Sequence, residues 1–318
     1  MQVARQKIMV LGTGGTIAGS AVQPGDNVGY QAGERSVQAL LGGLGHLALP
    51  PEMDLDAEQV AQIDSKNVDF ELWTALHRRC VVHLADEAIQ GIVITHGTDT
   101  LEETAWFLAC TLEARKPVVL TCAMRPATAL SPDGPQNLRD ALALACGARA
   151  AGVSVVSAGA VHLPRHVQKL HPYRLDALGS GDVGPVGWME EGHLRLAHPW
   201  PSAGEVDKPA FSVPKEGAAW PWVEIVLSHA GASGAQVDAL VRAGVRGLVV
   251  AATGNGSLHY RLEAALQRAQ QEGVQVRVGS RCPFGQIVGT PGHGLPLTGG
   301  LSPVKARISL MLELMQAQ

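Results

Sequence analysis

Two threonines follow glycine-rich turns in the first third of the chain, and their hydroxyl groups are the first candidates for chemistry. Thr16 belongs to residues 12–19 (GTGGTIAG), which follow an apolar run. Successive glycines let the backbone approach a ligand closely, and their N–H groups can face developing negative charge. A dinucleotide-binding GxGxxG loop is excluded, because Ile17 stands where that pattern requires its third glycine.

The second threonine, Thr98, lies in residues 92–104 (IVITHGTDTLEET), a pattern that indicates a strand, a turn and the start of a helix. Thr100 and Glu103 have the spacing of a capping box, so Thr98 and Asp99 are expected at the carboxyl end of a strand. In open α/β sheets, ligands bind at such strand ends. The alternative is that Asp99 is merely a second candidate for the helix cap.

Two threonine hydroxyls at two strand ends, one of them beside an aspartate, point to acyl transfer. A threonine hydroxyl is a weak nucleophile until a base activates it. A lysine can be that base when burial keeps its amine neutral. The chain has only seven lysines, and Lys169 lies in a polar segment just beyond an apolar run. Lys169 is therefore the candidate base, with an ordinary surface lysine as the alternative.

These residues need a rigid frame, and the hydropathy pattern predicts one. Short runs that are apolar throughout alternate with longer segments of helical periodicity, which is typical of a parallel sheet covered by helices. The predicted strands are 8–13, 91–95, 117–121, 153–157, 223–227, 247–251 and 274–278. The predicted helices are 68–85, 100–114, 135–150, 235–244, 258–272 and 303–316.

The same pattern predicts two α/β domains, with one large α/β domain as the alternative. Residues 1–200 would form a larger N-terminal domain that carries both threonines on a mostly parallel, doubly wound sheet. Residues 201–222 are rich in proline and read as a linker, and residues 223–318 would form a smaller α/β domain. Residues 19–35 form a long glycine-rich loop, which suggests a lid.

Composition excludes several classes of protein. Hydrophobic residues make up 46% of the 318 residues, which is enough for a packed core and excludes a chiefly disordered chain. The net charge is −4 and the basic residues are dispersed, so the sequence indicates no basic surface for nucleic acid or anionic lipid. Because no run of 18 apolar residues occurs, we expect no membrane span.

The five cysteines favour a reducing compartment. Their number is odd, no CxxC pair occurs, and most lie in apolar stretches, so we expect reduced and buried thiols. No leader peptide is recognisable at the start of the chain. The sequence therefore predicts a cytoplasmic protein.

Three histidines, His162, His166 and His171, could suggest a metal site. Pro164 separates the first two, so they do not share a helix face, and histidines of an ordinary loop are the favoured interpretation. The motifs HExxH and GxSxG and the dipeptide Gly-Lys are absent from the sequence. Zincins, serine hydrolases with a nucleophile elbow and P-loop enzymes are thereby excluded.

Four segments resemble the signatures of bacterial-type L-asparaginases and glutaminase-asparaginases. The first two are residues 13–19 (TGGTIAG) and 92–104 (IVITHGTDTLEET). The third is residues 123–126 (AMRP), followed by the polar positions 133–138 (DGPQNL), and the fourth is residues 253–256 (TGNG). They occur in the family's order over nearly the whole chain.

This resemblance implies an enzyme that hydrolyses the side-chain amide of asparagine, and to varying degrees glutamine, and releases ammonia without a metal or cofactor. Thr16 matches the nucleophile that forms the acyl-enzyme, and Tyr30 on the lid matches the tyrosine that polarises it. Thr98, Asp99 and Lys169 match the second threonine with its supporting acid and base. The pattern leaves open which threonine attacks first.

The resemblance also implies the substrate contacts and the assembly. Ser65 matches the residue that holds the substrate α-carboxylate, and Asp99 also receives the α-ammonium. Backbone groups that would line the amide are those at Gly15, Gly97, Thr98 and Ala123. A homotetramer built as a dimer of dimers is implied, with each site between the N-terminal domain of one subunit and the C-terminal domain of another.

The sequence departs from this pattern in four respects. Lys66 follows Ser65 where relatives usually carry Gln or Glu, and its ammonium cannot accept a hydrogen bond from the substrate. Lys66 therefore points away, bridges to a carboxylate, or indicates a substrate other than free asparagine. Residues 281–300 contain no Asp or Glu, although a neighbouring subunit often lends an acidic residue from there. Ser257 stands where many relatives have Asn, and the cysteines do not match the disulfide of the periplasmic enzymes.

The prediction is therefore an L-asparaginase that acts on a small amino-acid substrate through a threonine acyl-enzyme. An amino-acid-binding protein with a vestigial catalytic site is the alternative, supported mainly by Lys66. A third hypothesis is the glutaminase-like subunit of a tRNA-dependent amidotransferase. Those relatives carry an extra N-terminal domain, whereas the first strand predicted here starts at residue 8.

Overall fold

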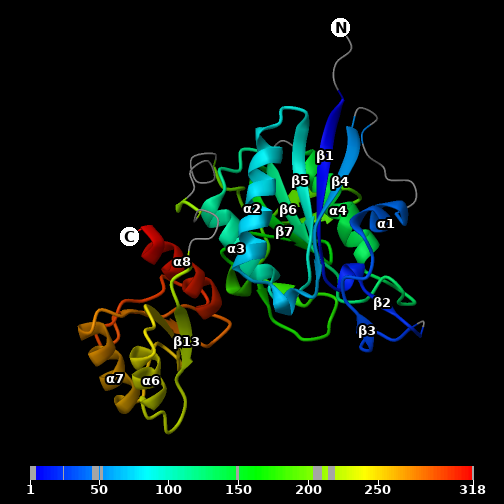
Figure 1. The fold of residues 1–318 in the computed structure, drawn as a ribbon. Helices are drawn as coiled ribbons and strands as arrows, with labels where there is room; N and C mark the ends of the chain where they lie inside the picture. Colours follow the sequence, from blue (N-terminus) through cyan, green and yellow to red (C-terminus); the bar gives the residue numbers. More distant parts are fainter. Residues whose placement is uncertain are drawn as a thin grey trace. The chain divides into compact units, whose positions relative to one another are not determined.

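The computed structural model describes residues 5–23, 25–44, 50, 53–147, 150–202, 210–213 and 219–316 (Figure 1). Its contacts divide the chain into two compact units, Met1–Ala210 and Phe211–Gln318. Much of the linker predicted at 201–222 lies outside the described residues. Each unit is an α/β structure with a parallel sheet, so the predicted fold class is confirmed.

The N-terminal unit contains an eight-stranded sheet. The five strands from β7 to β4 run parallel, and the remaining three run antiparallel. From one edge to the other the order is β12 (His193–Leu196), β11 (Gly187–Glu190), β8 (Ala160–His162), β7 (Gly152–Ser157), β6 (Pro117–Thr121), β5 (Ile89–Thr95), β1 (Gln6–Gly14) and β4 (Met53–Ile63).

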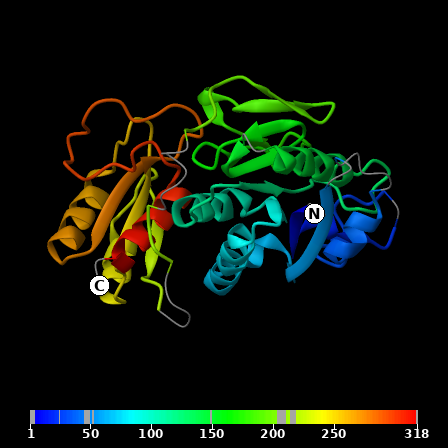
Figure 2. The ribbon, with the colours of Figure 1, turned by 90° about the horizontal axis from the view of Figure 1, so that it is seen from above.

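Helices cover both faces of this sheet, as Figure 2 shows from above. On one face lie α2 (Phe70–Ala85) and α3 (Leu101–Thr111), and on the other lie α1 (Val37–Gly42) and α4 (Gly134–Cys146). Every residue of β6 and β7 is buried, as expected for strands covered on both sides.

Two helices end three or four residues before their predicted ends. The helix predicted over 135–150 ends at Cys146, because Gly147 takes an extended backbone; positions 148 and 149 lie outside the described residues. The helix predicted over 100–114 ends at Thr111, because Leu112 is likewise extended.

Strand β1 lies at the point where the sheet's connections diverge. It pairs with β4 on one side and with β5 on the other, both in parallel register. At such a switch point the loops after the central strands separate and leave a crevice at their carboxyl ends. A single turn of 3-10 helix follows two of the strands, η1 (Thr16–Ala18) after β1 and η2 (Ser65–Asn67) after β4.

The predicted lid is more regular than a loop. Within residues 19–35, the short strands β2 (Ser20–Ala21) and β3 (Tyr30–Gln31) pair antiparallel, with Ala21 opposite Tyr30. Position 24 lies outside the described residues. The segment is therefore a small hairpin, hereafter the hairpin 20–31, and the expectation of an irregular loop is corrected.

The C-terminal unit is a three-stranded parallel sheet in the order β13 (Val223–Leu227), β14 (Gly247–Ala252) and β15 (Gln275–Ser280). Its helices are α6 (Ala235–Arg242), α7 (Tyr260–Gln271) and α8 (Pro303–Gln316), the last of which begins at the predicted proline. Within the described part of the chain, every helix is too short or too polar to cross a membrane.

Candidate active site

Thr16 lies directly beyond β1, on a turn that only glycine can form easily. Gly14 and Gly15 have φ values of 106° and 78°, a region that disfavours residues with a Cβ. The Gly15 N–H donates to the Ile63 carbonyl at the end of β4, over 2.8 Å. Thr16 is 8% exposed. The Gly15 N–H thus joins the turn to β4, which corrects the expectation that it faces the substrate amide.

The partner of the Thr16 hydroxyl is Tyr30 from the hairpin 20–31. The two oxygens, Thr16 Oγ1 and Tyr30 Oη, are 2.6 Å apart, and either one can be the donor. The ring packs tightly on Gly19, where a Cβ would lie 2.8 Å from Tyr30 Cδ2. The hairpin therefore brings a half-buried phenol to the first threonine, as the resemblance implied.

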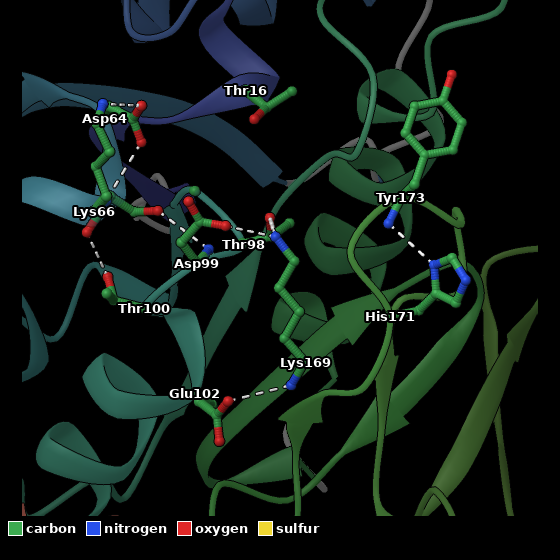
Figure 3. A network of polar contacts seen from close by, with 12 residues as sticks. Thr16, Asp64, Lys66, Thr98, Asp99, Thr100, Glu102, Lys169, His171 and Tyr173 are labelled. Atoms are coloured by element: carbon green, nitrogen blue, oxygen red, sulfur yellow. Dashed lines mark hydrogen bonds and ion pairs between the residues drawn. The ribbon is translucent and has the colours of Figure 1, made fainter. Parts of the chain in front are cut away.

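The second threonine centre is held by an ion pair (Figure 3). Lys169 lies on β9 (Gln168–Lys169), which pairs with β10 (Leu178–Gly179). Its Nζ donates to Thr98 Oγ1 over 2.8 Å and to Asp99 Oδ1 over 2.5 Å. The backbone N–H of Lys169 donates to Glu102 Oε1, which ties β9 to the start of α3. Because the ammonium can only donate, Thr98 Oγ1 accepts from it and keeps its own hydrogen for another partner.

The two centres meet through their glycines. A Cβ on Gly15 would lie 2.4 Å from the Gly97 Cα, so the two turns pack backbone against backbone. In Figure 3, Thr16 lies above the contact between Thr98 and Lys169. The structure thus brings the two hydroxyl-bearing turns to one place at the ends of β1 and β5.

Ser65, on η2, joins the same place from β4. It is 3% exposed, and a Cβ on Gly97 would lie 2.5 Å from its Oγ. Ser65 Oγ accepts from the Asp99 N–H over 3.2 Å, and the Ser65 carbonyl accepts from the Thr100 hydroxyl over 2.7 Å. The predicted capping box is therefore wrong at Thr100: this residue precedes α3, but its hydroxyl makes no cap bond.

Lys66 bridges to a carboxylate, one of the three outcomes considered for it. Its Nζ lies 2.6 Å from Asp64 Oδ2. The lysine side chain is 63% exposed and that of Asp64 is 34% exposed. The bond to Asp64 raises the pKa of Lys66, and the charge of Asp99 contributes in the same direction. Lys66 is thus a cation at the margin of the site, and Asp64 holds it.

Ala123 follows β6 and is fully buried. The motif around it organises the loop after the strand: Asn137 Nδ2 donates to the Cys122 carbonyl over 2.9 Å. The Asp133 carboxylate accepts from the N–H groups of Met124 and Arg125, each over 2.9 Å. This segment therefore sets the backbone path beside the two threonine turns.

Sequence reasoning passed over His96, which is fully buried between the site and the core. Its Nδ1 is 2.7 Å from the Gly97 carbonyl, and its Nε2 is 3.0 Å from Thr104 Oγ1. Thr104 also accepts from Trp73 Nε1, so its hydrogen is available to Nε2. This pattern assigns a neutral imidazole with its proton on Nδ1. Burial lowers the pKa of His96 to about 4, in agreement.

The candidate metal histidines have other partners. His162 Nδ1 contacts Ser180 Oγ at 2.8 Å, and His171 Nδ1 accepts from the N–H groups of Tyr173 and Arg174. No group of three His, Cys, Asp or Glu side chains in the described ranges is arranged to hold a metal ion.

All five cysteines lie in described parts of the chain, and all are free thiols. Cys80, Cys110 and Cys122 are buried, and burial raises the pKa of each to about 12. Cys146 is half-buried and Cys282 is exposed, so the expectation of burial holds for three of the five. The buried thiols are poor nucleophiles, because reactivity belongs to the thiolate.

The TGNG motif of the C-terminal unit anchors a loop. Asn255 Nδ2 donates to the Val288 carbonyl over 2.8 Å, and the Val288 N–H donates back to Asn255 Oδ1 over 2.7 Å. The Ser257 carbonyl accepts from the Thr253 hydroxyl over 2.8 Å. The motif thereby fixes the path of residues 281–300 within this unit.

Comparisons with known proteins agree with these local features. The family profile "Asparaginase, N-terminal" matches residues 7–202, and "Glutaminase/Asparaginase C-terminal domain" matches residues 222–318. The chain is 34% identical to a "Probable L-asparaginase periplasmic" of Haemophilus influenzae, over 98% of this chain and 89% of that protein. It is 35% identical to a "Glutaminase-asparaginase" of Pseudomonas fluorescens biotype A, over 98% of this chain and 87% of that protein.

Among solved structures, the crystal structure of a probable cytoplasmic L-asparaginase from Campylobacter jejuni is similar, with a TM-score of 0.90 and 36% identity. The similarity covers 98% of this chain and 95% of that chain. Both halves of the chain are thus matched in sequence, and its fold is matched in a solved relative. The chain belongs to the asparaginase family.

Proposed function

We propose that this protein hydrolyses the side-chain amide of L-asparagine to L-aspartate and ammonia through an acyl-threonine intermediate. The observation that carries the proposal is the pair of threonine hydroxyls on touching turns. Thr16 is held by a phenol at 2.6 Å and Thr98 by an ammonium at 2.8 Å. Amide hydrolysis needs a nucleophile and a proton for the leaving ammonia, and these two centres can supply both.

In the first half-reaction, Thr16 Oγ1 attacks the amide carbon and the C–N bond breaks. Tyr30 relays the Thr16 proton as the C–O bond forms: the phenol takes this proton up while it passes its own hydrogen to solvent water, and so stays neutral. Thr98 gives its hydrogen to the departing nitrogen and takes another from Lys169, whose ammonium is paired with Asp99. Ammonia leaves and the β-aspartyl group remains esterified to Thr16. The tetrahedral oxygen would be met by backbone N–H groups of the turns, among them that of Thr98.

In the second half-reaction, water cleaves the ester. Lys169 is now neutral, because it has given up a proton, and it can withdraw one from water through Thr98. The new C–O bond comes from water, the bond to Thr16 breaks, and Thr16 recovers its hydrogen. The sum is asparagine plus water giving aspartate plus ammonia.

For substrate recognition we propose Asp99 for the α-ammonium and Ser65 for the α-carboxylate. The Asp99 side chain is half exposed although its Oδ1 is bound to Lys169, so it can face a ligand. Gly97 and Ala123 would line the amide through their backbone. The binding-protein hypothesis drew its support from Lys66, and the bond from Lys66 to Asp64 removes that support.

Location and assembly are parts of the same proposal. We place the protein in the cytoplasm, supported by five free cysteines, a state typical of a reducing compartment. We also propose a homotetramer, a dimer of dimers, which sedimentation equilibrium would detect at four times the chain mass of 33.3 kDa.

The test of the activity is ammonia release from L-asparagine, L-glutamine, D-asparagine and β-aspartyl peptides by the purified protein. We expect release from L-asparagine that disappears in Thr16→Ala while the far-ultraviolet circular dichroism stays that of the wild type. Binding of asparagine in calorimetry without any release of ammonia would instead support the amino-acid-binding alternative.

A further inference from the structure

Asp64 binds Lys66 at two atoms. Asp64 Oδ2 accepts from the Lys66 ammonium over 2.6 Å, and Oδ1 accepts from the Lys66 backbone N–H over 3.3 Å. The second bond caps η2, the turn that carries Ser65. Figure 3 shows the Lys66 side chain turned toward Asp64 rather than toward Asp99. The Asp64 carboxylate therefore both caps η2 and holds the Lys66 ammonium.

The restraint matters because of what lies next to it. Ser65 accepts a hydrogen bond from the Asp99 N–H, so the turn that carries Lys66 is attached to the turn that carries Asp99. The charge of Asp99 acts on Lys66, since it contributes to the raised pKa of the lysine. The Asp99 carboxylate already binds Lys169 at 2.5 Å. A second lysine at Asp99 would neutralise the charge that an α-ammonium needs.

We propose that Asp64 is a positioning residue for substrate recognition, which holds the Lys66 ammonium away from Asp99 and so leaves that carboxylate to the substrate's α-ammonium. The inference rests on the proposed function for the identity of the substrate. It explains how a site for a zwitterionic amino acid accommodates a lysine immediately after Ser65.

The test compares ligands that differ only in the α-ammonium. Dissociation constants for L-aspartate and for succinate are measured by calorimetry, and kcat and KM are measured for L-asparagine. In Asp64→Asn, the amide oxygen can still cap η2, but the charge that holds Lys66 is lost. We expect about a fivefold rise in the aspartate Kd and the asparagine KM, as for one uncompensated charge near the surface. The succinate Kd should change less than about twofold, and kcat should change little.

A double variant tests whether Lys66 causes the weaker binding in Asp64→Asn. In D64N/K66Q the lysine is gone, so the aspartate Kd and the asparagine KM should return to those of K66Q alone. A matched control is Asp54→Asn, which removes the charge of an aspartate on β4 that is paired with Arg5, the residue before β1. We expect this variant to behave as the wild type.

Three results would overturn the proposal. One is an equal loss of aspartate and succinate binding in D64N, which would mean that Asp64 merely supports the turn. Another is a loss of aspartate binding that persists in the double variant, which would show that Lys66 is not its cause. The third is no change in the aspartate Kd or the asparagine KM of D64N. If the wild type binds aspartate but releases no ammonia from asparagine, the proposed function fails, and the binding constants still decide the role of Asp64.

Discussion

The two threonine centres are built from different kinds of structure. Thr16 meets a residue of the hairpin 20–31, whose two strands are joined by only two residue pairs. Thr98 meets Lys169, whose backbone is tied to α3 through Glu102, and the peptide before Thr98 is fixed by the buried His96. Both partners come from two-stranded elements of two residue pairs each, but the Thr98 centre is also joined to α3 through Glu102 and to the core through His96.

This difference suggests a division of labour. The Thr98 centre handles protons, and proton transfer requires fixed donor and acceptor distances. The Thr16 centre must admit the substrate beside the attacking oxygen, and a partner on a small hairpin can withdraw without disturbing the sheet. The contrast predicts that damage to the Thr98 side affects folding and chemistry together, whereas damage to the hairpin side affects chemistry alone.

The largest expected effect comes from removing either hydroxyl. Thr16→Ala and Thr98→Ala should each lower kcat for asparagine by about 10³-fold or more, because each centre performs a step that the other cannot. The double variant should be little worse than the single ones, since residues that act as a unit are not additive. Ammonia release under saturating substrate is the measurement.

The same variants decide which threonine attacks. Thr98→Ala retains the nucleophile but lacks both the hydrogen for the leaving ammonia and the route by which water is activated. The slow acylation that remains should therefore leave a β-aspartyl adduct on Thr16, which mass spectrometry detects after long incubation with asparagine. An adduct on Thr98 in the Thr16→Ala protein would reverse the assignment of the two centres.

The frame of the Thr98 centre was largely predictable from sequence. Strand 117–121 was predicted with its observed ends, and strand 153–157 lacked only its first residue, because both are short apolar runs bounded by turns. Strand β4 was missed, although Met53, Leu55 and Ala57 alternate with acidic residues and pack on the core. Its period of two is that of an edge strand with one buried face, and a search for continuous apolar runs does not detect it.

The contacts of the site were less predictable than its frame. Glycine spacing placed Thr16 and Thr98 at strand ends, but the link from Thr98 to Lys169 joins residues 71 positions apart. Local patterns gave Lys169 only as a candidate base, with a surface lysine as the alternative, and the family resemblance assigned it to Thr98. His96 was missed for the opposite reason: its neighbours in sequence are part of the motif, but its role depends on Thr104 and Trp73 across the core.

The next largest effect concerns stability and belongs to the Thr98 side. The pKa of His96 is lowered by burial from 6.5 to about 4, so the unfolded chain binds this proton more readily than the folded one. Its contribution is fully present above pH 6.5 and is lost as the pH falls toward 4. The loss amounts to about 3 kcal/mol of the free energy of unfolding. Urea unfolding between pH 7.5 and pH 4 measures it.

A matched variant separates His96 from the carboxylates that titrate in the same range. His96→Gln keeps a donor and an acceptor but has no proton to bind, so its free energy of unfolding should be lower at pH 7.5 and fall less steeply below pH 6.5. Parallel curves for the two proteins would contradict a neutral, buried His96.

The smallest expected effect is on the hairpin side, and it tests the comparison most directly. Tyr30→Phe removes one hydroxyl from a half-buried ring and leaves the packing on Gly19 intact. Because the lost hydrogen bond is worth about 1 kcal/mol, kcat should fall about fivefold, with the melting temperature within a few degrees of the wild type. A loss as large as that of Thr16→Ala would make the phenol indispensable for attack, and unchanged kcat would remove Tyr30 from the reaction. A marked fall in melting temperature would show instead that the hairpin belongs to the frame, and the contrast between the two centres would no longer hold.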